Sequence, residues 1–537
     1  MWRHRDEGSQ GMDRNGKDER GSQGLLFPGA GNVERAGARD VLQTPLDGRD
    51  PAPPEPEERS ADEARERYRE ERIAHWDEVA RSLDRLRGFG SAYHRRLERV
   101  YRTLVPPGRR VLEIGCGEGD LLAALHPSQG VGVDFSGEMV HRATIRHPQL
   151  RFVHGDAHDL SGLEGEFDAI IFSDLVNDVW DVQSVFQQVA RLANRQTRVI
   201  VNSYSLLWEL PLRIAGRLRL TRPNLPQNWL TGEDIANLLR LAGFDVVRSW
   251  REVLWPLPTP FLAALCNRFL VKIWPFRHLA LTSFIVARVP WRRRRGEPEP
   301  VVSVVVPARN EAGNIASILE RTPEMGSGTE LIFVEGHSAD DTYQVIEEEM
   351  ANFPERRCQL LRQSGKGKGD AVRLGFARAG GEVVMILDAD LTVPPEDLPR
   401  FYRALLEGKG EFINGVRLVY PMEHQAMRLA NLFGNKLFGL AFSWLLGQPI
   451  KDTLCGTKVL WKRDYEAIAA NRSYFGDFDP FGDFDLLFGA ARLNLRIVEV
   501  PIRYRERTYG TTNIRRWRHG WMLVKMVVFA AGRLKFV

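Results

Sequence analysis

The chain has 537 residues, with 74 Lys and Arg against 70 Asp and Glu and a formal net charge of +4. The length suggests about three domains or fewer, and 43% hydrophobic residues suffice for ordinary buried cores. The near-balanced charge argues against a dedicated nucleic-acid binder, because neutralising phosphates requires a clear basic excess. The four cysteines form no Cys-x-x-Cys pair, which argues against a zinc site or a disulfide framework and favours a reducing compartment.

Residues 1–60 contain nine Gly and six Pro, only two aromatic residues, and many charges of both signs. Such a segment buries too little apolar surface to offset its backbone entropy, so we expect a disordered tail. Its charged opening leads into no apolar stretch, so we expect no secretory leader. No uncharged apolar run of about 18 residues occurs anywhere, which predicts that no segment spans a membrane.

From residue 61 to about 290, short apolar runs alternate with amphipathic stretches, a rhythm that predicts a parallel sheet with crossover helices. Residues 291–300, rich in Arg and Pro, read as a linker. A second α/β series follows over 301–518, and its glycine pattern differs from that of the first, so no internal repeat joins them. We therefore predict two α/β domains.

In the first domain, Val111–Leu121 reads as a strand, a glycine-rich turn and the start of a helix. Glycines let the backbone approach a ligand closely, and a helix start presents free N–H groups. Two acids end the next two strands. Asp134 stands where a carboxylate can bind two ribose hydroxyls, and Asp156 stands where one can meet an adenine amine.

These features resemble the class I S-adenosylmethionine-dependent methyltransferases over roughly residues 75–290, including a late helix and strand at 228–247. The resemblance implies a Rossmann-like domain in which five residues contact S-adenosylmethionine: Glu113, Gly115, Gly117, Asp134 and Asp156. A nicotinamide-binding domain is the rival interpretation. Against it, Glu113 ends the strand before the glycines and no second Gly-x-Gly-x-x-Gly follows. A domain that binds the cofactor without methylating also stays open.

The sequence says much less about the methyl acceptor. Asp174, Asn177 and Asp178 follow the fourth strand, where they could contact substrate, solvate a loop or cap a helix. His154 and His158 flank Asp156 and could serve as bases or lie on the surface.

The second domain contains four polar segments, in order, at the ends of apolar strands or the start of a helix. They are Pro307–Glu311, Glu335–Thr342, the Gly-Lys loop 365–371, and Asp388-Ala389-Asp390. Two carboxylates two residues apart on a turning backbone can hold one hard divalent ion, which then binds a diphosphate.

This combination resembles glycosyltransferase family 2 with the GT-A fold, and within it the dolichol- or polyprenol-phosphate sugar synthases. Residues 485–501 are similar to the family's acid-Leu-Leu helix and following strand, and residues 507–513 to its phosphate-gripping loop. The resemblance implies nucleotide-sugar contacts at Pro307, Glu311, Glu335 and Asp388, Mg²⁺ or Mn²⁺ ligation by Asp388 and Asp390, and phosphate binding by Arg417 and Arg507. Glu335, Thr392 and Asn513 depart from the pattern, where Asp, Gln and Lys are usual.

The chemistry expected of this domain follows from charge. A metal across Asp388 and Asp390 would neutralise the leaving nucleoside diphosphate, so Asp390 counts among the catalytic residues. A polyprenyl phosphate acceptor is already anionic and hardly needs a general base. A hydroxyl acceptor would need one, and Asp485, then Asp483, are the candidates. Both acids also fit ordinary roles, as a helix N-cap and a loop acid.

The end of the chain is basic and apolar, since residues 500–537 contain nine Lys or Arg and one acid. Residues 519–537 predict an amphipathic helix suited to an anionic membrane surface. Leu429–Leu446 predicts a second apolar helix on the acceptor side. Alternatively, both helices pack into the core. The apolar but interrupted stretch Leu254–Val289 can also lie on a membrane without crossing it.

The sequence therefore predicts a bifunctional enzyme: a methyltransferase fused to an inverting, metal-dependent glycosyltransferase that uses a nucleotide-sugar donor and a polyprenyl phosphate acceptor. We expect it in the cytoplasm, peripherally bound to the inner face of the membrane, with no nucleic-acid partner. The alternative is a glycosyltransferase with a saccharide or protein acceptor and a first domain that only binds its cofactor.

Overall fold

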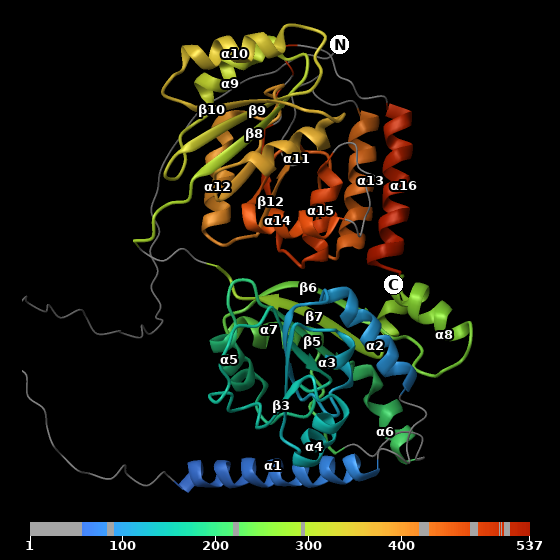
Figure 1. Ribbon diagram of the computed structural model, residues 1–537. Helices are drawn as coiled ribbons and strands as arrows, with labels where there is room; N and C mark the ends of the chain where they lie inside the picture. Colours follow the sequence, from blue (N-terminus) through green and yellow to red (C-terminus); the bar gives the residue numbers. More distant parts are fainter. Residues whose placement is uncertain are drawn as a thin grey trace, which may run out of the picture. The chain divides into compact units, whose positions relative to one another are not determined.

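The computed structural model describes residues 56–82, 91–217, 225–291, 296–417, 429–472 and 482–536, apart from several positions between 504 and 515 (Figure 1). Most of the expected disordered tail lies outside these residues. Helix α1 (Pro56–Ser82) begins inside that tail, so the expectation was wrong for its last residues. Pro at the first helical position and acidic residues in the first turn favour a helix start at this point.

The first sheet has seven strands in the order β3-β2-β1-β4-β5-β7-β6. Its strands are β1 (Arg110–Ile114), β2 (Gln129–Asp134), β3 (Arg151–His154), β4 (Ala169–Ser173), β5 (Arg198–Tyr204), β6 (Asp245–Glu252) and β7 (Thr282–Arg288). β7 runs antiparallel to both of its neighbours, so the sheet is mixed and not wholly parallel as expected. The segment between β6 and β7 brings the chain back into the sheet in the reverse direction. The two strands therefore pair as antiparallel neighbours.

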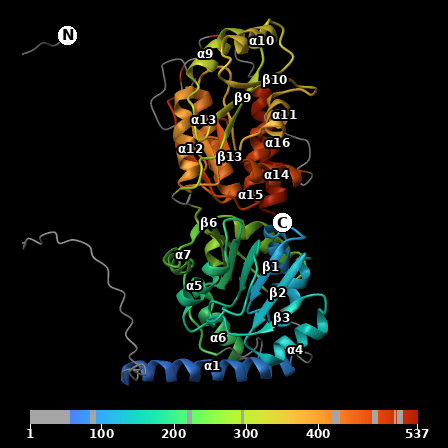
Figure 2. The same ribbon diagram turned by 60° about the vertical axis from the view of Figure 1, so that its left-hand side comes forward.

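Helices cover both faces of this sheet. The helices are α2 (Ser91–Leu104), α3 (Asp120–Ala124), α4 (Gly137–Arg146), α5 (Val182–Leu192), α6 (Glu209–Arg217), α7 (Gly232–Leu241) and α8 (Leu262–Ala264). Along β4, Ile170 and Phe172 join a buried cluster with α5 and α7, while Ile171 joins another with α2 and α3. Successive strand side chains point to opposite faces, so these two clusters are the two halves of the core. α5 and α7 lie side by side (Figures 1 and 2).

The second sheet also has seven strands, in the order β10-β9-β8-β11-β13-β12-β14. They are β8 (Val302–Ala308), β9 (Thr329–Glu335), β10 (Arg357–Arg362), β11 (Val383–Ile386), β12 (Phe412–Val416), β13 (Lys458–Trp461) and β14 (Ile497–Pro501). β13 is antiparallel to β11 and β12, whereas β8, β9, β10 and β11 are parallel. The parallel strands bring the carboxyl ends of β8, β9 and β11 to one edge of the sheet.

The helices of the second domain again form two layers. They are α9 (Ile315–Arg321), α10 (Thr342–Asn352), α11 (Lys368–Arg378), α12 (Leu398–Leu406), α13 (Leu429–Leu446), α14 (Lys462–Ala470), α15 (Asp483–Arg492) and α16 (Arg516–Leu534). On β8, Val304 packs in the cluster that holds α9 and α12, and Val305 in the one that holds α11 and α15. The architecture is thus two α/β domains, as the sequence predicted.

Helix α16 has two apolar faces. Leu523, Met526 and Ala530 are buried in the core cluster, where α16 packs against α13. Trp521 and Val528 are 62% and 68% exposed. Core packing therefore accounts for one face of the helix and leaves the other uncovered. Among the described residues, no helix combines the length and the hydropathy that a membrane crossing needs.

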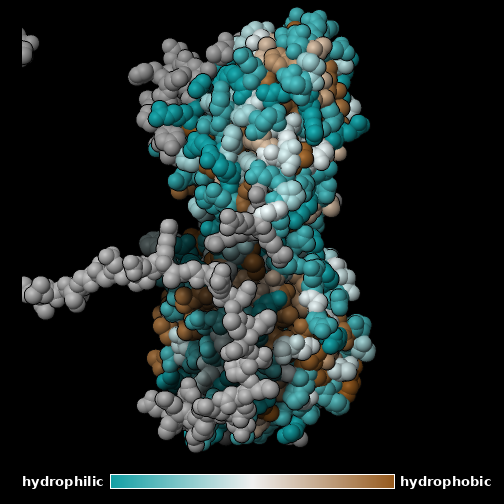
Figure 3. Space-filling model, turned by 90° about the vertical axis from the view of Figure 1, so that its left-hand side faces the viewer, coloured by the Kyte–Doolittle hydropathy of each residue, from teal (hydrophilic) through white to brown (hydrophobic). Residues whose placement is uncertain are grey.

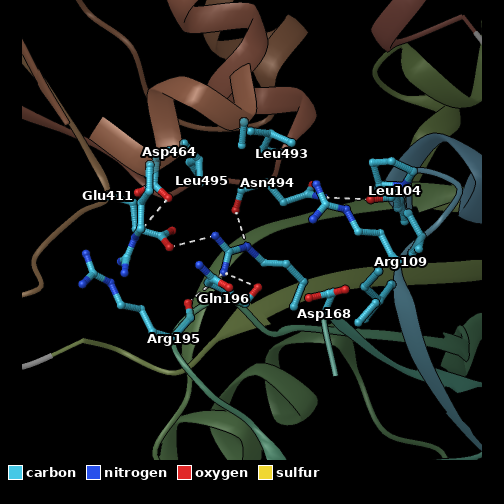
Figure 4. Close-up of a pocket in the computed structure, with 17 residues that line it drawn as sticks. Leu104, Arg109, Asp168, Arg195, Gln196, Glu411, Asp464, Leu493, Asn494 and Leu495 are labelled. Atoms are coloured by element: carbon cyan, nitrogen blue, oxygen red, sulfur yellow. Dashed lines mark hydrogen bonds and ion pairs between the residues drawn. The ribbon is translucent and has the colours of Figure 1, made fainter. Parts of the chain in front are cut away.

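Residues Ser60–Val537 form one compact unit. Within it, polar side chains of the first domain contact residues of the second. The Arg198 guanidinium lies 2.7 Å from the Glu411 carboxylate and donates to the carbonyl of Asn494 at 3.1 Å (Figure 4). Arg248 donates to the side-chain oxygen of Asn494 at 2.6 Å. Arg198 and Glu411 are almost fully buried, and Glu411 also lies 3.7 Å from Arg288. Removing Glu411 would therefore take a carboxylate partner away from both arginines.

Candidate cofactor and donor sites

The glycine-rich turn after β1 holds a carboxylate from β2. Gly115 and Gly117 have φ of +72° and +52°, a region that favours glycine, and a Cβ on Gly115 would lie 2.8 Å from Leu175. The N–H groups of Gly117 and Ser136 each donate to Asp134 at 2.9 Å. The turn and the end of β2 therefore form one rigid polar corner at the carboxyl edge of the sheet.

Two buried carboxylates give this corner its electrostatic character. Burial raises the pKa of Glu113 to about 8, although the Leu122 N–H group partly opposes this. One Glu113 oxygen, Oε2, is buried with no hydrogen-bond partner. Burial also raises the pKa of Asp134, against the two backbone N–H groups that it accepts. A ligand that supplies hydroxyl donors or positive charge suits this corner.

The N-terminal helix α1 contacts acids that follow β3 and β4, a role that sequence reasoning missed. Its Arg69 pairs with Asp156 at 3.2 Å, and its Arg72 and Trp76 donate to Asp178 at 3.1 and 2.7 Å. In sequence these residues read as an ordinary solvated helix, because nothing local to α1 identifies acids about a hundred residues away. Asp178 is thus engaged by α1.

Asp156 holds the expected position at the end of β3 with two partners. Its carboxylate accepts from His158, at 2.7 Å to Nδ1, as well as from Arg69. Burial would raise the pKa of Asp156, but these partners lower it to about 2. The other candidate histidine, His154, contacts the Phe135 carbonyl at 2.9 Å through Nε2. Both histidines therefore have structural partners.

Asp174 lies at the end of β4 in a cluster of polar and aromatic side chains. Tyr93 donates its hydroxyl to Asp174 at 2.9 Å, and Asn202 donates its amide at 2.5 Å. Tyr204 stacks on Tyr93 with ring centroids 5.9 Å apart. Burial raises the pKa of Asp174 to about 7, despite the opposing hydrogen bonds. Asn177, in contrast, is fully buried and ties loops together by donating to the Asn228 carbonyl. Asp174 is therefore the predicted acceptor-side residue best suited to exchange a proton.

In the second domain, an acidic cluster lies at the carboxyl ends of β8 and β11. Arg507 bridges two of its members, at 3.1 Å from Glu311 and 2.7 Å from Asp390. Lys368, at the start of α11, lies 2.5 Å from Asp388. The structure therefore brings together Glu311, Asp388, Asp390 and Arg507, as the sequence predicted, and adds Lys368 as a partner.

The electrostatics of the cluster depend on these basic partners. Burial would raise the pKa of Asp388, but the charge and hydrogen bond of Lys368 hold it below its usual value. Burial raises the pKa of Glu311 to about 7, and the opposing charge of Arg507 does not fully compensate. Thr392 donates its hydroxyl to Asp390 at 2.8 Å. The acids are thus oriented by neighbours that a ligand could displace.

The backbone and one glycine fix the positions of these acids. Three non-glycine residues beside strand ends have positive φ: Asn310 at +57°, His337 at +58° and Leu391, between Asp390 and Thr392, at +53°. Such strain concentrates at functional sites. At Gly456, a Cβ would collide with the Asp388 carboxylate and the Lys368 ammonium group. Sequence reasoning missed Gly456, since no local pattern marks it.

The donor set fits a divalent ion in part. Two oxygen-donating carboxylates, Asp388 and Asp390, stand two residues apart, and Mg²⁺ is commonly held by one or two carboxylates together with substrate phosphates. Within the described residues, no group of three or more His, Cys, Asp and Glu could hold a metal by itself. Water and the ligand would therefore have to complete the coordination.

Three other predicted residues lie further from this cluster or have structural partners. Glu335 ends β9, is 3% exposed and accepts the Ser338 N–H group at 2.5 Å. Pro307 lies in β8, partly exposed. Arg417 is held by Asp452 through two hydrogen bonds of 2.7 and 2.9 Å. Its charge nevertheless contributes to lowering the pKa of Asp388.

The two candidate bases lie at the start of α15. Asp485 is 8% exposed and pairs with Arg472 at 2.8 Å. Asp483 is the first residue of the helix, and its side chain lies outside the described part of the chain. A Cβ on Gly482 would collide with the backbone of Gly369 in α11, so the start of α15 abuts the Gly-Lys loop.

Comparison with known proteins identifies both domains. A family model described as "Methyltransferase domain" matches residues 68–249, and one described as "Glycosyl transferase family 2" matches residues 303–468. The chain therefore carries a methyltransferase domain followed by a family 2 glycosyltransferase domain. This confirms the two resemblances drawn from the sequence motifs.

Curated relatives match the second domain. Glycosyltransferase AglJ of Haloferax volcanii is 28% identical over 229 residues, which are 42% of this chain and 71% of AglJ. An undecaprenyl-phosphate 4-deoxy-4-formamido-L-arabinose transferase of Proteus mirabilis is 36% identical over 112 residues, 20% of this chain and 34% of the relative. The chain thus spans only about a third of the length of that second relative.

Solved structures resemble each domain. A putative methyltransferase of Haloferax volcanii, in complex with the Trm112 activator, is 19% identical, with 40% of this chain and 98% of that chain covered and a TM-score of 0.32. Glucosyl-3-phosphoglycerate synthase of Mycobacterium tuberculosis, solved with Mn²⁺ and uridine diphosphate, is 22% identical, with 45% and 86% covered and a TM-score of 0.34.

Replacing Glu113 by Gln should change how the stability of the cofactor-free protein depends on pH. With a folded pKa of about 8, Glu113 keeps a proton that the unfolded chain releases near pH 4.5. The unfolding free energy should therefore fall as pH rises between these values, by up to about 1.4 kcal/mol per pH unit. Urea unfolding across this window should show a shallower fall for Glu113→Gln, and Glu233→Gln, at an exposed position in α7, is the control. Identical curves for wild type and Glu113→Gln would contradict the prediction.

Proposed function

We propose that the protein is a bifunctional transferase. Its first domain transfers a methyl group from S-adenosylmethionine, and its second transfers a sugar from a nucleotide-sugar to a polyprenyl phosphate, with inversion at the sugar carbon. The observation that carries the proposal is the cluster of Glu311, Asp388 and Asp390 with Arg507 and Lys368 at one sheet edge. Such a cluster can hold a charged diphosphate and stabilise it as it leaves.

The roles of the charged residues follow from their present partners. Asp388 and Asp390 would hold Mg²⁺ or Mn²⁺, which supplies the positive charge that stabilises a leaving nucleoside diphosphate. Lys368 and Arg507 now bind those same carboxylates, so a metal there would release both cations toward the donor phosphates. Arg suits a phosphate because its guanidinium can donate two parallel hydrogen bonds. Glu335 and Pro307 would line the nucleotide pocket, and the positive charge of Arg417 would help to bind the phosphates.

Two observations support an anionic lipid acceptor. The undecaprenyl-phosphate transferases among the relatives carry that acceptor in their names, and helices α13 and α16 present exposed apolar residues such as Leu440 and Val528. A phosphate acceptor needs no general base, which agrees with the ion pair between Asp485 and Arg472. A saccharide or protein acceptor, the alternative, would require Asp485 or Asp483 to take a proton.

The first domain has features suited to S-adenosylmethionine. The unpartnered oxygen of Glu113 and the raised pKa values of Glu113 and Asp134 favour a ligand with positive charge and hydroxyl donors. This cofactor has a sulfonium, an ammonium and a ribose diol. Gly115, Gly117 and Asp156 would complete the contacts. Asp174 would accept the proton that a methyl acceptor loses, whereas a domain that only binds the cofactor would have no use for this carboxylate.

We place the protein in the cytoplasm, bound peripherally to the inner face of the membrane. The support is the exposed apolar face of α16, which carries Lys525 and Arg533 beside Trp521 and Phe529. Aromatic and basic side chains on one helix suit the interface of an anionic bilayer.

The acidic pair gives the first prediction for this function. Asp388→Ala and Asp390→Ala should abolish metal-dependent sugar transfer to polyprenyl phosphate and leave S-adenosylmethionine binding unchanged, because the acids and the glycine-rich turn belong to different sheets. Radiolabelled sugar transfer and calorimetry measure the two activities. Asp397→Ala, which breaks a partly exposed ion pair with Arg400, is the control. Full transfer by either variant in chelator would disprove the metal assignment.

Asp134 gives the second. Asp134→Ala should weaken S-adenosylmethionine binding by roughly the 1.5–3 kcal/mol typical of hydrogen bonds to charged groups. Because Asp134 also holds Gly117 and Ser136, thermal unfolding must show that the variant is folded at the temperature of the calorimetric titration. Asp120→Ala, an exposed acid in the neighbouring helix, is the control. Unchanged affinity would mean that the ribose binds elsewhere.

The exposed face of α16 gives the third. Deleting residues 521–537 would remove Leu523, Met526 and Ala530 from the core, so substitution is the cleaner test. Trp521→Glu with Val528→Glu should lower sedimentation with anionic vesicles and transfer to long-chain acceptors, while donor binding persists. High salt should release the wild type only partly, because an inserted apolar face survives screening. The control is Leu241→Glu. If Trp521→Glu with Val528→Glu bound vesicles as strongly as this control, the anchoring role would be contradicted.

A further inference from the structure

The methyltransferase domain carries an exposed apolar surface of its own, formed by residues 206–214 and 257–279. More than half of the exposed large hydrophobic side chains among the described residues belong to these two segments. Phe261 is 91% exposed, Trp274 70%, Ile273 47% and Leu207 60%. Isolated exposed hydrophobic residues are ordinary, but a contiguous set of this kind marks an interaction surface.

The two segments lie side by side. The Ser205 N–H group donates to the Leu281 carbonyl at 2.7 Å, and the Trp208 indole donates to the Leu279 carbonyl at 2.9 Å. Helices α6 and α8, one from each segment, lie on the same side of the domain in Figure 1. The face drawn in Figure 3 is the opposite one, where hydrophobic residues are interspersed among hydrophilic ones. The two segments therefore form one exposed apolar surface.

This surface is rigidly held rather than loosely attached. Lys272 is buried against Glu252, which also pairs with Arg96 at 3.0 Å. The Asn267 side chain accepts the N–H groups of Leu254 and Trp255 at 2.8 and 2.7 Å. These contacts tie the segment 257–279 to the rest of the domain.

Phe261 shows that the exposure is enforced by the backbone. Its φ is +59°, a region that bulky residues rarely adopt, and its ring is almost wholly in solvent. A strained backbone that presents an unburied aromatic ring gains nothing in the isolated chain. The ring is therefore available to a binding partner.

Charge identifies the partner. Residues 253–281 contain no Asp or Glu, but do contain Arg268, Arg277 and His278. In the other segment the one acid, Glu209, is paired with Arg213. Aromatic and aliphatic side chains fringed by unopposed cations fit the interface of an anionic bilayer, where tryptophan and arginine favour the headgroup region.

We propose that residues 206–214 and 257–279 insert into the headgroup boundary of an anionic membrane, so that the methyltransferase domain makes lipid contacts of its own in addition to those of α16. The proposal extends the membrane association proposed above for the second domain. The exposed apolar surface also lies next to the proposed methyl-transfer site. Strand β5 ends at Tyr204, beside Tyr93 and Asp174, and the surface starts two residues later.

A fluorescent label separates this surface from α16. In the full chain with Cys358→Ser, which removes the half-buried thiol and leaves three buried ones, the variants Phe261→Cys, Val528→Cys and Ile145→Cys would each carry an environment-sensitive nitrobenzoxadiazole group. Ile145 is 68% exposed in α4, outside the surface. With vesicles of phosphatidylcholine and phosphatidylglycerol, we expect the label at 261 to shift to the blue and to be quenched by brominated lipid, and the label at 145 to stay unchanged.

Substitution gives the matching affinity test. Phe261→Glu with Trp274→Glu should weaken partition into the same vesicles about tenfold or more, since each large apolar side chain contributes that order of binding when buried. Ile145→Glu should not, and unchanged thermal unfolding would confirm that both variants are folded. The α16 variant Trp521→Glu with Val528→Glu should retain the signal at 261.

The outcomes distinguish this proposal from the function of the second domain. Insertion of the label at 528 alone would overturn the docking of the methyltransferase domain and leave the anchoring by α16 intact. No insertion at either position would overturn both. A doubled mass in solution without vesicles, abolished by Phe261→Glu with Trp274→Glu, would assign the surface to a second copy of the chain and also overturn the proposal.

Discussion

Both candidate sites depend on carboxylates that are taken out of water at the carboxyl ends of parallel strands. An ionised carboxylate in such a place is costly unless donors or cations surround it. In the first domain the donors at Asp134 are backbone N–H groups of Gly117 and Ser136. In the second, Asp388 and Asp390 are balanced by Lys368 and Arg507. This difference in partners sets what each site can bind.

Backbone donors leave the pKa values of Glu113 and Asp134 raised in the first site, whereas the cations of the second site bring it near neutrality. Glu113 and Asp134 are raised in pKa, so a positively charged ligand would be stabilised by them as they ionise. In the second site a positive ion can enter only by displacing a cation, and the displaced Lys or Arg then becomes available to an anion. The fold is similar in both domains, but the partners of the acids select ligands of opposite charge.

The sequence predicted the elements whose signals are local. The glycine-rich turn, Asp134 at the end of β2 and the Asp388–Asp390 pair at the end of β11 all follow short apolar runs, and the structure places them there. Contacts between distant segments left no such signal. Arg72 of α1 binds Asp178, for example. Strand β7 runs antiparallel to its neighbours, although its apolar run reads like those of the parallel strands in the same sheet. Propensity and periodicity describe one segment at a time, and these features are set by pairs of segments.

Helix α16 shows the same limit in another form. Its apolar pattern predicted a helix with a hydrophobic face, but the core and a membrane surface both select Leu, Val and Phe. Only the structure assigns Leu523 and Met526 to the core and leaves Val528 in solvent. Arg417 is a similar case, because its partner Asp452 stands 35 positions later and no motif joins the two. The sequence therefore predicts the role of a single charged residue less well than it predicts the position of a strand.

The bridging of Glu311 and Asp390 by one guanidinium has a consequence for ionic strength. Arg507 already sits among the acids, so a donor that arrives with its own divalent counter-ion exchanges partners without creating new net charge in the site. Screening acts on uncompensated charge over a distance of about 10 Å at moderate salt. Under the proposed function, affinity for a metal-bound donor would vary little with added salt, whereas binding of basic residues to an anionic bilayer would vary strongly. Salt would then act on the proposed membrane binding and leave the proposed donor binding largely unchanged.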